Sequence, residues 1–251
     1  MKYPEMIFFD QGHTLTYSPE KNRENGFSAL WEHVCANPHD RSFEDFTAEA
    51  QRIFDDVDRV TDSFDYDIPF TASLRLLTDS LGISLDIPPS EQEYVFLKAA
   101  RPVVPMPGAA EMLEFLASRG IRRAVVSNNR FSGEALLRQN RELFGENCPE
   151  FVISSADYMV RKPDKRLFSA ALNRAGISPE NVWHCGDVAN ADVMGARYSG
   201  IFPVLYEEMS VDNPFLRFNK GFSFETGELL RIGSWNEFCH VIEELEMKDH
   251  K

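Results

Sequence analysis

An uninterrupted apolar run near the start of the chain ends directly in a carboxylate. The four residues 6–9 are Met-Ile-Phe-Phe, and Asp10 follows them. A short run without polar residues is typical of a strand that is buried on both faces of a parallel sheet. Ligands of such sheets bind beyond the carboxyl ends of the strands, where Asp10 would lie. The run therefore predicts either a functional acid at a sheet edge or a structural acid that caps the next turn.

Strand-like and helix-like segments alternate along the second half of the chain. We expect strands at 124–126, 151–153, 182–185, 202–206 and 229–232. We expect helices before, between and after these strands, at 109–118, 133–143, 164–175 and 235–245. Strands separated by helical segments of this length indicate βαβ units, a parallel sheet and right-handed crossovers.

The segment between the first strand and residue 101 has a different character. We expect four amphipathic helices and no strand there, with the helices at 23–36, 42–59, 70–81 and 90–100. In the second of them the apolar residues recur at spacings of three and four, which places them on one helical face. We therefore predict an α/β protein with a Rossmann-like parallel sheet core (1–16 and 102–251) and an inserted α-helical cap domain (17–101).

Charge and cysteine content exclude several classes of protein. The formal net charge of −14 argues against a nucleic-acid binder, since phosphate backbones require a basic surface. No apolar run approaches the roughly 20 residues that cross a bilayer, and no signal-peptide pattern precedes the first strand, so we expect no membrane partner and a cytoplasmic location. The four cysteines are scattered, which argues against a zinc site.

Polar residues follow four of the expected strands or the loops that adjoin them. Each has an ordinary alternative as a turn residue, a surface charge or a helix cap, but all fall at one edge of the inferred sheet. They are Asp10, Ser127, Asn128, Lys162, Asp187 and Asp192.

These side chains have complementary chemistry. Three carboxylates in one place require a cation, and oxygen ligands suit Mg²⁺. The metal and Lys162 would neutralise a phosphoryl group, and Ser127 with the following backbone N–H would donate hydrogen bonds to it. No other group in the set activates water at neutral pH. A covalent intermediate on Asp10 is therefore the natural path.

The chain also resembles the haloacid dehalogenase-like (HAD) hydrolase superfamily. Four motifs carry the resemblance in the expected order: residues 8–15 (FFDQGHTL), 125–129 (VVSNN), 162–164 (KPD) and 186–192 (GDVANAD). The resemblance implies that Asp10 is the nucleophile and a Mg²⁺ ligand. It further implies metal ligands at the Gly12 carbonyl, Asp187 and Asp192, phosphoryl binding by Ser127 and Asn128, and charge stabilisation by Lys162. The helical block matches the family's cap, which selects small substrates.

One position departs from the family's phosphatases. They carry a second aspartate two residues after the nucleophile, which protonates the leaving group; here that position is Gly12. A positioned acid–base group contributes about 10²–10⁴-fold, so its absence predicts slow turnover, a good leaving group or a replacement acid. His13 is the nearest titratable candidate, although turn packing is the more ordinary role for it.

Three classes of function are compatible with these residues. The first is a magnesium-dependent phosphatase that acts on a small phosphorylated metabolite. The second is a weakly active or inactive relative that binds a ligand or a protein partner, for which a phenylalanine-rich loop at 210–227 would provide a surface. The third, a 2-haloacid dehalogenase-type hydrolase, fits least, because it needs no metal. Substrate identity and oligomeric state leave no trace in the sequence.

Overall fold

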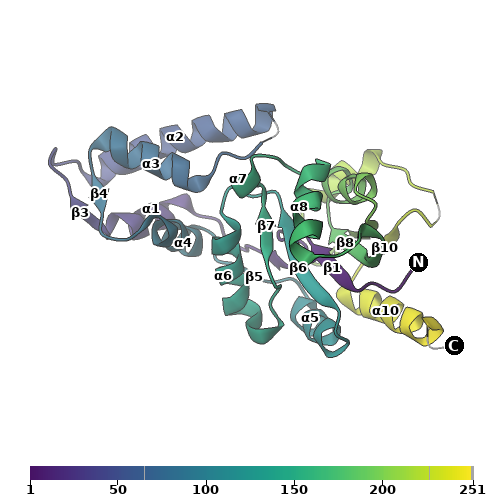
Figure 1. Cartoon of the computed structure of the whole chain (residues 1–251). Helices are drawn as coiled ribbons and strands as arrows, with labels where there is room; N and C mark the ends of the chain where they lie inside the picture. The colour runs from purple at the N-terminus through teal and green to yellow at the C-terminus, as the bar shows by residue number, and fades with distance from the viewer. Residues whose placement is uncertain (65, 226, 250–251) are drawn as a thin grey trace.

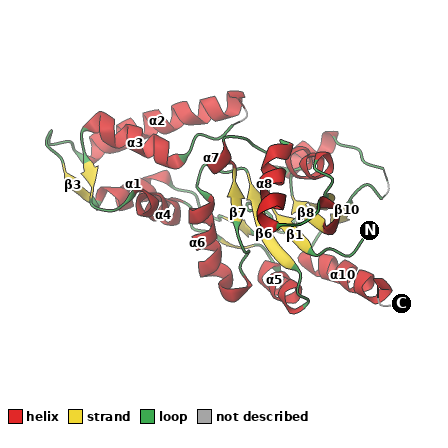
Figure 2. Ribbon diagram, viewed as in Figure 1, coloured by secondary structure: helices red, strands yellow, loops and turns green. Residues whose placement is uncertain are grey.

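A six-stranded parallel sheet forms the centre of the computed structural model, which describes residues 1–64, 66–225 and 227–249. Its strand order is β10-β9-β8-β1-β6-β7, and every neighbouring pair is parallel. The strands are β1 (Met6–Phe9), β6 (Arg122–Ser127), β7 (Val152–Ser154), β8 (Val182–Gly186), β9 (Phe202–Tyr206) and β10 (Leu230–Ile232). The fold is therefore α/β and Rossmann-like, as the alternation of segments predicts (Figures 1 and 2).

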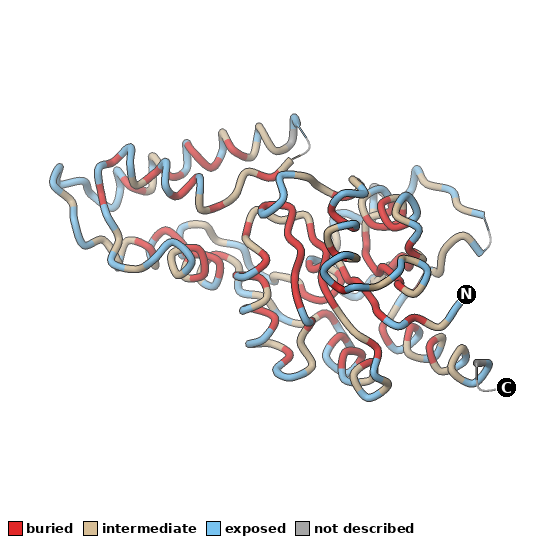
Figure 3. The backbone as a smooth tube through the Cα atoms, in the orientation of Figure 1, coloured by how far each residue is buried: buried red, intermediate tan, exposed pale blue. Residues whose placement is uncertain are grey.

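Helices cover both faces of this sheet, and alternate side chains of β1 face opposite layers. Met6 and Phe8 belong to the apolar cluster that contains residues of α8, whereas Ile7 and Phe9 pack in the cluster of α5 and α10. All four are fully buried, as the red strands of Figure 3 illustrate. The helices that accompany the sheet are α5 (Ala109–Ser118), α6 (Gly133–Phe144), α7 (Ser155–Tyr158), α8 (Lys165–Ala175), α9 (Gly195–Tyr198) and α10 (Trp235–Asp249). Short 3-10 helices lie at η1 (Gly145–Asn147), η2 (Pro179–Asn181) and η4 (Leu216–Gly221), and a π-helix lies at η3 (Ala189–Met194).

The segment between β1 and the rest of the sheet forms a helical block that lies beside the sheet (Figure 1). Its helices are α1 (Arg23–Trp31), α2 (Phe43–Phe64), α3 (Phe70–Leu81) and α4 (Pro89–Ala100). Aromatic rings fill its interior, and Phe96 contacts Phe27, Phe54 and Phe70. Phe131, from the loop that follows β6, packs against Phe70 and Phe96, so the block and the sheet region share one apolar core.

The expectation of an all-helical block with no strand is wrong. The helix expected at 23–36 ends at Trp31, and the next residues form β3 (Val34–Ala36), which pairs antiparallel with β4 (Ser84–Leu85). Two further short strands, β2 (Thr16–Tyr17) and β5 (Val104–Pro105), pair where the chain enters and leaves the block. Strands of two or three residues are too short to show a period of two, so sequence pattern cannot reveal them.

No helix within the described ranges is long and apolar enough to cross a membrane.

Candidate active site

The turn after β1 is fixed from three sides, which places Asp10 at the carboxyl edge of the sheet. The Asp10 amide donates to the Cys185 carbonyl at 2.8 Å. Gln11 exchanges two 2.9 Å hydrogen bonds with Asn140 of α6. The Trp235 indole donates to the Thr14 carbonyl at 3.2 Å. Because these partners are buried, the turn is held rigidly and Asp10 faces a defined cavity.

This cavity has a volume of about 400 Å³ and lies over the ends of β1, β6 and β8. The structure brings together there every site residue that the sequence indicates: Asp10, Gly12, Ser127, Asn128, Lys162, Asp187 and Asp192. They come from four separate segments. Three of these follow the parallel strands β1, β6 and β8, whose ends meet at one edge of the sheet, and the fourth, with Lys162, lies between α7 and α8.

Lys162 joins two of the acids. Its Nζ lies 2.6 Å from Asp10 Oδ1 and 2.6 Å from Asp192 Oδ1, and its side chain is 2% exposed. Burial acts against the ammonium, but the two carboxylates raise the pKa of Lys162. It is therefore a permanent cation at the floor of the cavity.

The carboxylate of Asp192 accepts three hydrogen bonds from the described residues. Oδ1 accepts from Lys162 and from His184 Nε2 at 2.9 Å, and Oδ2 accepts from the Val188 amide at 3.0 Å. Burial opposes its ionisation, yet Lys162 and His184 hold the pKa of Asp192 below its usual range. Burial lowers the pKa of His184, so a neutral imidazole donates to Asp192. Asp192 thus orients Lys162, and both of its oxygens already accept hydrogen bonds.

Asp187 is a buried acid with neutral donors. Thr14 Oγ1 donates to Oδ1 at 3.4 Å, and Asn213 Nδ2 donates to Oδ2 at 2.8 Å. Burial, followed by repulsion from Asp10 and Asp192, raises the pKa of Asp187 to about 8. Burial likewise raises the pKa of Asp10 against the lowering influence of Lys162. Three carboxylates thus share one ammonium, and the site lacks positive charge for all three to ionise.

This excess of acid fits a divalent cation between Asp10 and Asp187. Within the described residues, no three His, Cys, Asp or Glu side chains form a metal-binding group. Asp192 Oδ1 already accepts from two donors, so Asp10, Asp187 and a backbone carbonyl are the least committed oxygen donors, with Asp192 Oδ2 beside them. Mg²⁺ is commonly held by one or two carboxylates and completes its shell with water and phosphate, so this donor set suits it.

Ser127 and Asn128 lie at the end of β6 and behave differently. Ser127 is buried in the cavity wall. The Asn128 side chain makes two hydrogen bonds with the backbone of Lys162. Its Oδ1 accepts from the Lys162 N–H at 2.7 Å, and its Nδ2 donates to the Lys162 carbonyl at 3.1 Å. Its side chain therefore anchors the backbone of Lys162.

Above Gly12 there is open space, because a Cβ built there meets no atom within 4 Å. The next residue, His13, has a left-handed backbone (φ 53°) and packs edge-on against Phe215, with ring centroids 5.8 Å apart. Burial and Lys21 lower the pKa of His13, so its imidazole is held neutral. No hydrogen bond reaches its buried Nδ1 within the described part of the chain.

Sequence reasoning missed the contribution of the loop after β9. Asn213 binds Asp187, and Phe215 lines the cavity. Asn219 fastens this loop, because its side chain accepts from the Ala189 amide and donates to the Asp187 carbonyl, both at 2.8 Å. The expected irregular loop at 210–227 contains η4. The sequence carries no signal for this contact, because the loop at 210–227 has only two asparagines and no periodic pattern.

Comparison with known proteins agrees with this geometry. A family model described as haloacid dehalogenase-like hydrolase matches residues 6–200. A haloacid dehalogenase-like hydrolase domain-containing protein 3 of Xenopus laevis is 33% identical over 116 residues, 46% of each chain. A glyceraldehyde 3-phosphate phosphatase of Methanothermobacter thermautotrophicus is 32% identical over 104 residues, which is 40% of this chain and 44% of that protein. A pyrimidine 5′-nucleotidase of Escherichia coli is 30% identical over 126 residues, 49% of this chain and 54% of that protein. The matched part thus spans about half the length of these relatives.

Solved structures share the fold over nearly the whole chain. A 2-haloacid dehalogenase from Pseudomonas syringae aligns with a TM-score of 0.59 at 20% identity, covering 96% of this chain and 99% of that one. A HAD phosphatase from Thermococcus onnurineus aligns with a TM-score of 0.59 at 16% identity, covering 96% and 98%. Together with the match of the family model, the sheet order and the four motifs at its carboxyl edge, these findings show that the chain belongs to the haloacid dehalogenase-like hydrolases.

Proposed function

We propose that the protein is a magnesium-dependent phosphatase that hydrolyses a small phosphorylated metabolite through an aspartyl-phosphate on Asp10. One observation carries the proposal: Lys162 holds Asp10 at the floor of the cavity, next to a second buried acid, Asp187, whose hydrogen-bond donors among the described residues are neutral. The named phosphatase and nucleotidase among the relatives support the same substrate chemistry.

In the first step an oxygen of Asp10 attacks phosphorus, and the bond from phosphorus to the ester oxygen breaks. Lys162 binds Oδ1, so Oδ2 is the oxygen that attacks. Lys162, Ser127 and the Asn128 N–H balance the charge on the phosphoryl oxygens, the type of electrostatic support that usually contributes most to catalysis. The leaving alkoxide must take a proton from water or solvent, because Gly12 supplies no acid.

In the second step water attacks the phosphorus of the aspartyl-phosphate, which releases inorganic phosphate and restores the Asp10 carboxylate. Mg²⁺, bound by Asp10, Asp187 and the Gly12 carbonyl, would supply positive charge to the phosphoryl oxygens and allow both acids to ionise. Asp192 and Asn128 contribute by orienting Lys162.

Phosphate release from 4-nitrophenyl phosphate, with Mg²⁺ or with a chelator, tests the proposal. We expect metal-dependent turnover that falls at least about 10³-fold in Asp10→Asn. Asp79→Asn, at an exposed position of α3, is the matched control and should retain wild-type activity. If a broad panel of phosphate esters is not hydrolysed by protein that binds Mg²⁺, the chain is a binding protein instead. Metal-independent halide release from a 2-haloacid would assign it to the dehalogenases.

A further inference from the structure

Two cations on the cavity wall, Lys21 and Arg101, form no ion pair with any residue that the structure describes. Five Lys and Arg side chains line the active-site cavity: Lys21, Arg101, Arg130, Arg161 and Lys162. Arg130 pairs with Asp58, Arg161 lies 3.5 Å from Asp67, and Lys162 binds two acids. Within the described ranges, no side-chain hydrogen bond or ion pair satisfies Lys21 or Arg101. In a chain of net charge −14, such unpaired cations at the active site require a reason.

Their position follows from the two connections between the helical block and the sheet. Lys21 precedes α1, and Arg101 follows α4. The Asn22 amide donates to the Ala100 carbonyl at 2.9 Å, which holds the two segments next to each other. The two positive charges therefore lie together where the chain enters and leaves the block.

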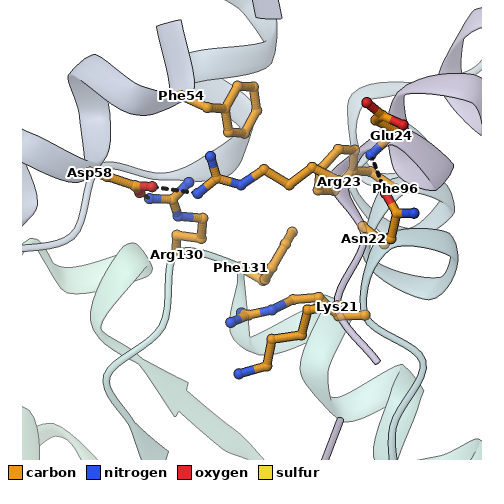
Figure 4. A pocket seen from close by; sticks show the side chains of 11 residues that line it. Lys21, Asn22, Arg23, Glu24, Phe54, Asp58, Phe96, Arg130 and Phe131 are labelled. Atoms are coloured by element: carbon orange, nitrogen blue, oxygen red, sulfur yellow. Dashed lines mark hydrogen bonds and ion pairs between the residues drawn. The ribbon is translucent and has the colours of Figure 1, made fainter. Parts of the chain in front are cut away.

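Two further arginines, Arg23 and Arg130, add positive charge near Lys21 and Arg101. Arg23 and Arg130 both bind Asp58, and Arg23 also reaches Asp55 at 3.3 Å, so these two acids are already paired with other cations. Figure 4 shows these two guanidinium groups at Asp58, with Lys21 well apart from it. Burial, with Arg130 and Arg23, lowers the pKa of Arg101, and burial with Arg101 lowers that of Lys21. An anion bound here would offset the repulsion among these cations.

A second cavity adjoins the first at these residues. It has a volume of about 640 Å³, and Lys21, Arg101 and Arg130 line both cavities. Glu24 also lines the second cavity, so one further carboxylate stands beside the four cations there. Three aromatic side chains, Phe54, Phe96 and Phe131, form its apolar wall (Figure 4). The space therefore combines an aromatic surface with free positive charge on the side of the active-site cavity.

We infer that Lys21 and Arg101 bind a second anionic group of the substrate, a carboxylate or another phosphoryl, while its first phosphoryl lies at Asp10 and its organic part extends along the aromatic cavity. The substrate class is then a phosphate monoester of an organic acid, or a bisphosphate. This inference rests on the proposed phosphatase function and specifies its substrate.

Three esters that share a four-carbon chain test the inference: 4-phosphooxybutanoate, butane-1,4-diol bisphosphate and 4-hydroxybutyl phosphate. The first two esters carry a second anionic group, and the third does not. We expect the wild-type kcat/KM for at least one of the first two to exceed that for hydroxybutyl phosphate by roughly 10- to 100-fold, because a charge-assisted hydrogen bond contributes about this much. Arg101→Met and Lys21→Met should each reduce this ratio severalfold. Lys248→Met, at an exposed site near the end of α10, is the control and should keep it.

The outcomes separate the two proposals. Equal hydrolysis of the three esters overturns the anion site and leaves the phosphatase standing, and so does a ratio that survives both substitutions. If none of these alkyl esters is hydrolysed, the assay with 4-nitrophenyl phosphate decides the phosphatase proposal separately, and calorimetric titration of Asp10→Asn decides the anion site. Tighter binding of phosphooxybutanoate or butanediol bisphosphate than of hydroxybutyl phosphate then supports the site, and equal binding of all three rejects it.

Discussion

Asp192 positions Lys162, whose Nζ lies 2.6 Å from Asp192 Oδ1 and equally far from Asp10 Oδ1. The other Asp192 contacts are His184 and the Val188 amide, so this acid holds the lysine in place from the wall of the cavity. Two variants follow from this relationship, and they should differ in severity.

Lys162→Met should nearly abolish phosphate release and destabilise the fold by about 3–5 kcal/mol, because it leaves two buried carboxylates without their cation. Asp192→Asn keeps the size of the side chain, so we expect kcat to fall about 10- to 100-fold with KM almost unchanged, the scale of a lost supporting contact. Steady-state kinetics and urea unfolding measure both. Lys165→Met, exposed on the same segment, is the control. An Asp192→Asn enzyme with wild-type kcat would contradict the positioning role.

Gly186 tests the same arrangement through the backbone. A Cβ at this position would lie 2.1 Å from Asp192 Cγ and 2.4 Å from its Oδ2. Gly186→Ala should therefore displace Asp192, lower kcat about tenfold or more and cost roughly 1–3 kcal/mol of unfolding free energy. Gly221→Ala is the matched control, because its Cβ meets no atom within 4 Å. Equal kinetics for the two variants would show that the exact place of Asp192 is unimportant.

Gly12 offers the opposite experiment, in which a group is added. Because the space above it is open, Gly12→Asp should fold normally and place a carboxyl group near the leaving oxygen. If proton transfer limits the rate, hydrolysis of alkyl phosphates should rise by up to about 10²–10⁴-fold and that of aryl phosphates much less. Gly12→Asn has the same shape without the acid and should show no such gain. An unchanged ratio of alkyl to aryl rates would mean that the proton comes from elsewhere.

Sequence alone predicts the convergence of the site residues but not the direction of their side chains. Asp10, Lys162 and Asp187 could be placed at one sheet edge because parallel strands end on the same side. That Asn128 and Asp192 turn towards Lys162 depends on hydrogen bonds between segments far apart in the chain. Sequence pattern carries no information on such contacts.

The parts of the fold that escaped prediction have a related cause. The strands β2 to β5 are too short for an alternating pattern, and the turn between Trp31 and Val34 has no Gly or Pro to mark it. The role of Asn213 depends on Asn219, which ties a loop without periodicity to the Asp187 carbonyl. Local propensity decides helices and long strands, whereas tertiary contacts decide these pieces.

Removal and return of metal should change stability as well as activity. Among the described residues, the hydrogen-bond donors to the Asp187 carboxylate are the neutral Thr14 and Asn213, and repulsion from Asp10 adds to the cost of its burial. Binding of Mg²⁺ to the native state alone should therefore raise the melting temperature. At a Mg²⁺ concentration of 100 times its Kd, binding adds about 2.7 kcal/mol to the free energy of unfolding, which raises the melting temperature by roughly 5–10 °C for a chain of this size.

Asp187→Asn should abolish this increase in melting temperature. The metal-free variant should melt no lower than the metal-free wild type, since the amide carries no charge to bury. Sodium chloride at matched ionic strength controls for screening. A variant that still gains stability from Mg²⁺ would locate the metal away from Asp187, whereas loss of the gain in Asp187→Asn but not in Asp79→Asn would assign it there.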